Sequence, residues 1–103
     1  MDWKNKIISR LSAGQVAIFK ITSHDLDPIV PCNSEVILGP IAKTSCLQVQ
    51  DIVFATLNEK SYLYQIDDKK DDFFEFRSLR GRSLGTFSKN IIHGLVILIK
   101  HSS

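Results

Sequence analysis

Hydrophobic and polar positions follow a helical period only near the start of this chain. The apolar side chains of that stretch recur at i, i+4, i+5 and i+8, at Trp3, Ile7, Ile8 and Leu11. This spacing gathers them on one face of an amphipathic helix, with basic residues mostly on the other faces. We therefore predict a helix over residues 2–12. Packing against a sheet is its ordinary role, and contact with a membrane or a partner is the alternative.

The rest of the chain has the pattern of short β-strands. Apolar or alternating stretches cover residues 15–21, 35–38, 52–57, 61–66, 73–79 and 91–99. Each has the length and the composition of a strand. The last stretch is so apolar that we expect it to be covered on both faces.

Turn signals separate these stretches. They are Pro28, Pro31, Gly39-Pro40, a hairpin turn at 58–60, a charged run at 67–72 that is typical of a solvated hairpin tip, and a glycine-containing loop at 80–85. Most connections are short, which favours antiparallel pairing. We predict a single, mainly β domain over residues 1–103. Its six or seven strands, within residues 15–100, would coil into a partly closed antiparallel barrel.

Composition agrees with one ordinary globular domain. The chain has 103 residues, of which 44% are hydrophobic and 23% charged, and this excludes a disordered or coiled-coil protein. A formal net charge of +2 is too small to indicate a nucleic-acid partner by itself. No stretch approaches the roughly 20 apolar residues that cross a bilayer. We expect a soluble cytoplasmic protein with no membrane span.

The cysteine and histidine spacings do not suit a metal site. Cys32 and Cys46 match no zinc-binding pattern. Reduced thiols are their expected state in the cytosol, and a disulfide between them is the alternative. His24, His93 and His101 fall on a loop, in a strand and at the end of the sequence, so we do not expect them to converge. The sequence indicates neither a metal nor a cofactor.

The stretch from Asp25 to Val53 combines a proline-bounded loop, a strand, a Gly-Pro turn and another strand. It contains Asp-Leu-Asp-Pro, then Glu-Val-Ile-Leu-Gly-Pro, and ends with Gln-Asp-Ile-Val. This order resembles the core of the signal-peptidase and LexA-like serine peptidase superfamily, whose pattern is Ser-Met-x-Pro followed by Val-Gly-Asp-Ile-Val. Ile-His-Gly-Leu-Val near the end of the chain resembles the family's closing strand. The resemblance implies a coiled β-fold of the LexA type.

The positions that carry the family's chemistry differ in this chain. Asp25 stands where the resemblance implies a nucleophilic serine, and Tyr64 stands where it implies a lysine or histidine base. Arg82 replaces the acid of the third family element. A serine needs a neighbouring base to become nucleophilic, and tyrosine, with a pKa of about 10, is a weak base at neutral pH. We expect a peptidase-like fold without catalysis, with Asp25 and Tyr64 close together.

The leading hypothesis is a non-catalytic module, encoded by a phage or another mobile element, that binds or modulates a protein partner. Active relatives bind an extended peptide along a strand edge. We expect such an edge here, with Asp25 and Asp27 at one end and Arg80 and Arg82 at the other, ready to bind a partner by β-augmentation.

Two alternatives remain open. The first is a residual or altered serine peptidase that uses Ser23 or Ser45 with Lys43 or Lys60. The second is a small nucleic-acid-binding β-domain, in which cations interleave with aromatic rings that stack on bases. Its candidate residues are Arg77, Arg80, Arg82, Lys89, Phe74, Phe76 and Phe87.

Overall fold

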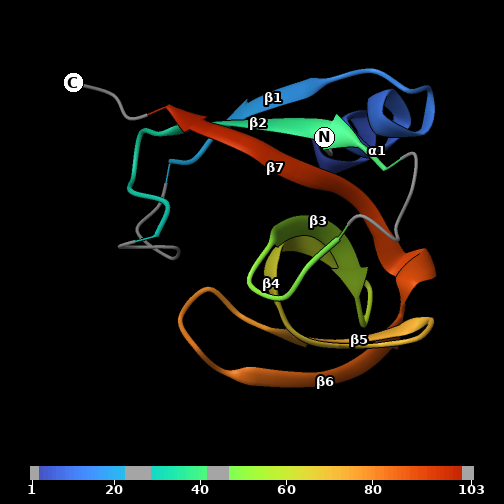
Figure 1. Ribbon diagram of the computed structural model, residues 1–103. Coiled ribbons are helices and arrows are strands. Elements are labelled where there is room, and N and C mark those ends of the chain that lie inside the picture. The colour runs from blue at the N-terminus through green and yellow to red at the C-terminus, as the bar shows by residue number, and fades with distance from the viewer. Residues whose placement is uncertain (1–2, 23–28, 42–46, 101–103) are drawn as a thin grey trace.

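The fold is a curled antiparallel sheet with an α-helix packed on it (Figure 1). The computed structural model describes residues 3–22, 29–41 and 47–100. In these residues the elements are α1 (Trp3–Ser12), β1 (Ala17–Lys20), β2 (Glu35–Pro40), β3 (Ile52–Leu57), β4 (Lys60–Lys70), β5 (Phe73–Arg77), β6 (Ser83–Ser88), the 3-10 helix η2 (Lys89–Ile91) and β7 (Ile92–Lys100). The prediction of a mainly β fold with one short N-terminal α-helix is confirmed.

Within the described residues, seven strands form one sheet in the order β1-β2-β7-β3-β4-β5-β6. All neighbouring pairs are antiparallel. Strands that follow one another in sequence are neighbours, except for β2 and β3, which β7 separates, and for β6 and β7, which lie apart. In Figure 1, β1, β2 and β7 lie together with α1, and β3 to β6 curl into a half-barrel.

Apolar side chains pack against both faces of the sheet at β3. Phe54 belongs to the helix-side core, which also contains Ile7, Leu11, Phe19, Val36 and Leu38. Val53 and Ala55 belong to the barrel core inside the curl, with Leu57, Tyr64, Ile66, Phe74 and Phe76. Side chains alternate between faces along a strand, so β3 contributes to both cores. Complete burial of a side chain such as Phe54 contributes about 1.5–3 kcal/mol.

A glycine sets the distance between α1 and the sheet. Leu11 of α1 lies over Gly94 of β7, where an added Cβ atom would be 2.7 Å from the Leu11 Cδ1 atom and 3.0 Å from the carbonyl oxygen of Gly39. Real Cβ atoms essentially never come that close to another heavy atom. The missing side chain at Gly94 therefore allows the helix to pack directly on β7.

The β3–β4 hairpin closes through the two-residue turn Asn58-Glu59. Both residues have positive φ, at 49° and 70°. Type I′ turns require this combination, and their backbone twist matches that of the flanking strands. Asparagine is common in such turns, whereas glutamate at Glu59 takes a conformation that glycine adopts more easily.

Two predicted turn segments belong to strands. Gly39 and Pro40 form the end of β2, because they pair with β7 instead of closing the strand. The charged run predicted as a hairpin tip extends β4 through residues 67–70, because these residues run antiparallel to β5. Only Asp71 and Asp72 form the turn itself.

The strand β6 was not predicted from the sequence. Half of the predicted 80–85 loop belongs to it, because its backbone pairs with β5 and leaves a bulge at Leu84. Gly85 has a φ of 106°, which suits the bulge because glycine has no Cβ atom. In contrast, β1 and β5 are shorter than the predicted stretches 15–21 and 73–79.

The expectation that the last strand is covered on both faces is wrong for its end. β7 is shifted by one residue from the predicted 91–99, and the side chains of Ile97 and Leu98 are 59% and 50% exposed. The curl carries β3 to β6 away from this end of β7 (Figure 1). The described part of the chain therefore covers these two side chains only in part, with Ile97 lying over Gly39 of β2.

Candidate functional site

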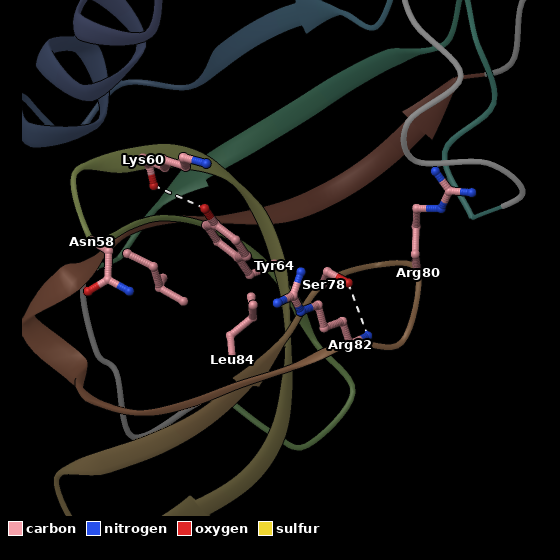
Figure 2. Close-up of a pocket in the computed structure, with 8 residues that line it drawn as sticks. Asn58, Lys60, Tyr64, Ser78, Arg80, Arg82 and Leu84 are labelled. Carbon is pink, nitrogen blue, oxygen red and sulfur yellow. Dashed lines mark hydrogen bonds between the residues drawn. The ribbon is translucent and has the colours of Figure 1, made fainter.

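A pocket of about 530 Å³ opens inside the curled half of the sheet (Figure 2). Its lining comes from the end of β3, the β3–β4 turn, β4, the β5–β6 connection and β6. The residues are Leu57, Asn58, Lys60, Tyr64, Ser78, Arg80, Arg82 and Leu84. Segments far apart in the sequence thus meet here because the sheet curls.

The pocket combines apolar walls with positive charge. Leu57 and Tyr64 are buried members of the barrel core, and Leu84 packs against that core. Three lining residues carry positive charge, and the lining contains no aspartate or glutamate among the described residues. Figure 2 shows the Arg82 side chain extending toward Tyr64, whereas Arg80 points away from the pocket. The arrangement suits a group with an apolar part and a carboxylate.

Tyr64 acts as a hydrogen-bond donor in this pocket. Its phenol hydroxyl donates to the backbone oxygen of Lys60 at 3.0 Å. Burial raises the pKa of Tyr64 above its ordinary value of about 10, because an apolar environment disfavours the phenolate. The phenol is therefore neutral at physiological pH and cannot act as the base that a serine nucleophile needs.

The backbone of the β5–β6 connection fixes the position of Arg82. Ser78 Oγ accepts a hydrogen bond from the Arg82 backbone N–H at 3.1 Å, and the Ser78 N–H donates to the Arg82 oxygen at 2.8 Å. The N–H of Gly81, whose φ is 96°, donates to the Ser78 oxygen at 2.9 Å. These contacts involve only the backbone of Arg82, so its guanidinium is left to face the pocket.

The structure brings together the predicted site residues that it describes. Tyr64, Arg80 and Arg82, which the sequence singled out separately, line one pocket. Asp25 and Asp27 lie outside the described residues, so the expected proximity of Asp25 to Tyr64 stays a prediction. Sequence reasoning missed the apolar walls formed by Leu57 and Leu84, because only the curl of the sheet reveals them.

Other candidate residues fall in different places. Lys60 lines the pocket, but Ser23, Lys43 and Ser45, its suggested companions in a peptidase, lie outside the described residues. Cys32 is a half-buried free thiol. Cys46, His24 and His101 also lie outside the described residues.

Two of the three rings and two of the four cations suggested for nucleic-acid binding are engaged within the protein. Phe74 and Phe76 are buried in the barrel core, so their faces are not available to bases. Arg77 donates to Gln65 Oε1 at 3.0 Å and lies 3.9 Å from Asp67, and Lys89 pairs with Asp72 at 3.3 Å. These two cations already have partners within the protein.

The described residues contain no group of three or more histidine, cysteine, aspartate or glutamate side chains that could hold a metal ion. In the same part of the chain, no helix is both long enough and apolar enough to cross a membrane. The sequence matches no family model and no curated protein. We therefore infer the function from the residues of the pocket.

Proposed function

We propose that this protein is a non-catalytic binding module for a protein partner, built on a scaffold related to the signal-peptidase and LexA-like serine peptidases. One observation supports this function above all. A pocket with apolar walls and an inward-pointing arginine, Arg82, opens beside the edge strand β6. An edge with an adjacent pocket is the arrangement that binds an extended peptide.

The strand β6 is suited to this contact. Among the described strands it pairs with β5 alone, so its other edge has backbone groups free to bond an added strand. Such backbone bonds supply affinity, and a side-chain pocket supplies specificity. A carboxylate-bearing side chain of the partner would lie between Arg82 and the wall formed by Leu84.

The pocket chemistry favours binding over hydrolysis. Ser78 and Lys60 both line it, and a serine with a lysine is a known catalytic pair. However, Ser78 Oγ is held by the Arg82 backbone, and no hydrogen bond joins it to Lys60 Nζ among the described residues. Tyr64, which stands at the base position, is a neutral donor.

Charge reversal at each arginine tests the binding role. Because Arg82 faces the pocket and Arg80 does not, Arg82→Glu should reduce capture of partner proteins from the native host much more than Arg80→Glu. The exposed Lys70, on the distant end of β4, provides the matched control Lys70→Glu. Capture is measured by quantitative mass spectrometry. Equal capture profiles for the Arg82 and Lys70 variants would exclude the pocket as a binding site.

The same variants separate binding from folding. Exposed substitutions usually change stability by less than about 0.5 kcal/mol, which shifts the melting temperature of a domain this size by about 2–4 °C. We expect all three variants to stay within that range.

A fluorophosphonate probe tests the peptidase alternative. It labels serines that a neighbouring base has activated. We expect no labelling of the native protein and the same background in Ser78→Ala. Labelling that disappears in Ser78→Ala would show residual catalysis in this pocket, and labelling that persists would point to another serine.

A further inference from the structure

Positive charge is concentrated in α1 and β1. Residues 3–22 contain Lys4, Lys6, Arg10 and Lys20 and no aspartate or glutamate, although the whole chain carries a net charge of only +2. The remaining residues are therefore slightly acidic as a group. This end of the molecule presents a positive surface at the opposite end of the strand order from β6.

A groove of about 490 Å³ runs between α1 and β1. Lys6 and Arg10 line it from the helix, and Ile18, Phe19 and Lys20 line it from the strand. Trp3 completes the floor, with its ring centroid 5.0 Å from that of Phe19 and with 41% of its surface exposed. The groove therefore has apolar walls and a positive rim.

The strand along this groove is an edge of the sheet. Among the described strands β1 pairs with β2 alone. The guanidinium of Arg10 donates two hydrogen bonds to the carbonyl oxygen of Val16, which lies just before the strand. The donor atoms Nε and Nη2 are 3.2 Å and 3.1 Å from this oxygen. The backbone of β1 beyond that point can bond another extended chain.

The face of β1 that turns away from α1 is apolar and exposed. The strand register aligns Ile18 with Ile37 and Ile37 with Leu98 across three strands. Ile18 is 57% exposed and Leu98 50%. An exposed sheet face is normally polar, and a contiguous apolar patch marks an interaction site. Lys20, Glu35 and Lys100 form the next row and border this patch.

We propose that the β1 edge binds an extended segment of a partner protein in which acidic and aliphatic residues alternate. Successive side chains of an added strand point to opposite faces of the sheet. On one face the acidic side chains would reach Lys6 and Arg10. On the other the aliphatic side chains would continue the row that begins at Ile18. Positive charge on one side of β1 and an apolar row on the other therefore favour a segment in which acidic and aliphatic residues alternate.

This site is independent of the pocket beside β6, since the two edges lie at opposite ends of the sheet order. Failure of either binding site therefore leaves the other proposal standing.

Trp3 provides the measurement, because it is the chain's one tryptophan and lies in the groove. The probe is the alternating peptide Asp-Val-Asp-Val-Asp-Val-Asp-Val, titrated into the full chain. A block peptide of the same composition, with four aspartates followed by four valines, is the control. We expect the alternating peptide to change Trp3 fluorescence with an affinity about tenfold higher than the block peptide.

Variants locate the binding. Lys6→Glu with Arg10→Glu should lower the affinity for the alternating peptide about tenfold or more, because the two proposed attractions to its aspartates become repulsions. Lys70→Glu, which reverses one positive charge far from the groove, should leave the affinity unchanged. Near-ultraviolet circular dichroism should show that both proteins stay folded.

Several results would overturn the proposal. They are no binding of the alternating peptide, equal affinity for the block peptide, or equal loss of affinity in the Lys70 variant. Binding of phosphatidylserine vesicles or oligothymidine that the double variant abolishes, without peptide binding, would assign the surface to a membrane or to nucleic acid instead.

Discussion

His93 is the residue whose protonation should control stability near neutral pH. Its Nε2 atom lies 2.8 Å from Thr56 Oγ1, which in turn lies 2.7 Å from Ser61 Oγ. Partial burial lowers the pKa of His93 below its ordinary value of about 6.5, because the charged ring loses solvation. The ring is therefore mainly neutral in the folded protein at neutral pH.

We expect stability to fall as the pH drops below about 6.5. In this range His93 is protonated in the unfolded chain but still neutral in the folded protein, because its pKa is lower in the folded state. The free energy of unfolding therefore decreases with falling pH until His93 is protonated in the folded state as well. Above about pH 7 both states are neutral at this residue and its contribution is constant. Urea unfolding between pH 7.5 and pH 5.5 measures the effect. His93→Gln should show a weaker pH dependence, and an unchanged one would assign the effect to other groups.

Glu59 is a candidate for stabilisation by substitution. Its φ of 70° lies in the left-handed region, where a side chain costs about 1 kcal/mol that glycine avoids. Glu59→Gly should therefore raise the free energy of unfolding by about 0.5–1 kcal/mol. Asn58→Gly is the matched control, because asparagine already tolerates this conformation, and its effect should be smaller. A destabilised Glu59→Gly protein, measured by urea unfolding, would contradict the prediction.

Some residues of the candidate site could be predicted from the sequence, and others could not. Tyr64 was singled out by resemblance, and Arg82 both by resemblance and as one of the cations interleaved with aromatic rings, and the structure places both at one pocket. The direction of the Arg82 side chain depends on backbone hydrogen bonds around Ser78, which no pattern of residue types reveals. Leu84 looked like part of a loop because its inward position depends on the bulge in β6.

The contact between α1 and β7 should be sensitive to a single added methyl group. A methyl group at position 94 would overlap Leu11 and the Gly39 carbonyl. Gly94→Ala should destabilise the protein by about 1–3 kcal/mol, as overpacking generally does. In a Leu11→Ala background the same change should cost less, because its main steric conflict has been removed. Additive losses in thermal unfolding would show that Leu11 is not the limiting contact.

The ends of a strand were predictable where its apolar residues form a clear pattern, either continuous or alternating with polar ones. Residues 52–57 form β3 as predicted, since all of them except Thr56 are apolar and the strand lies between two cores. β6 was missed because Ser83–Ser88 contains two large apolar residues and a glycine, and its pairing with β5 outweighs its weak strand pattern. At the end of β7 the apolar pattern was read as burial, whereas the structure leaves Ile97 and Leu98 exposed.

The whole sheet depends on its last strand. β7 pairs with β2 on one side and with β3 on the other. A chain that ends at Asn90 should therefore lose the native sheet, because β1 and β2 are no longer joined to the rest and an isolated hairpin is marginal in water. A two-dimensional amide NMR spectrum should show collapsed dispersion for this truncated chain. Native-like dispersion would mean that β3 to β6 fold without β7.

The class of fold was predictable from strand patterns and short turns, but the strand order was not. Short turns indicate only that strands next to each other in the sequence pair with each other. The position of β7 between β2 and β3 depends on contacts between residues that are 37 to 65 positions apart in the sequence, and local patterns cannot indicate such contacts.

The central position of β7 also matters while the protein is being made. About 60 residues separate the end of β2 from the end of its partner β7. At a synthesis rate of about 5–20 residues per second, the finished β2 waits roughly 3–12 s for that partner. During this delay β2 can pair with β1 but leaves its other edge and its apolar side chains exposed, which is the form that chaperones bind and that aggregates. We therefore expect the yield of folded protein to depend on chaperones and on translation speed more than its small size suggests.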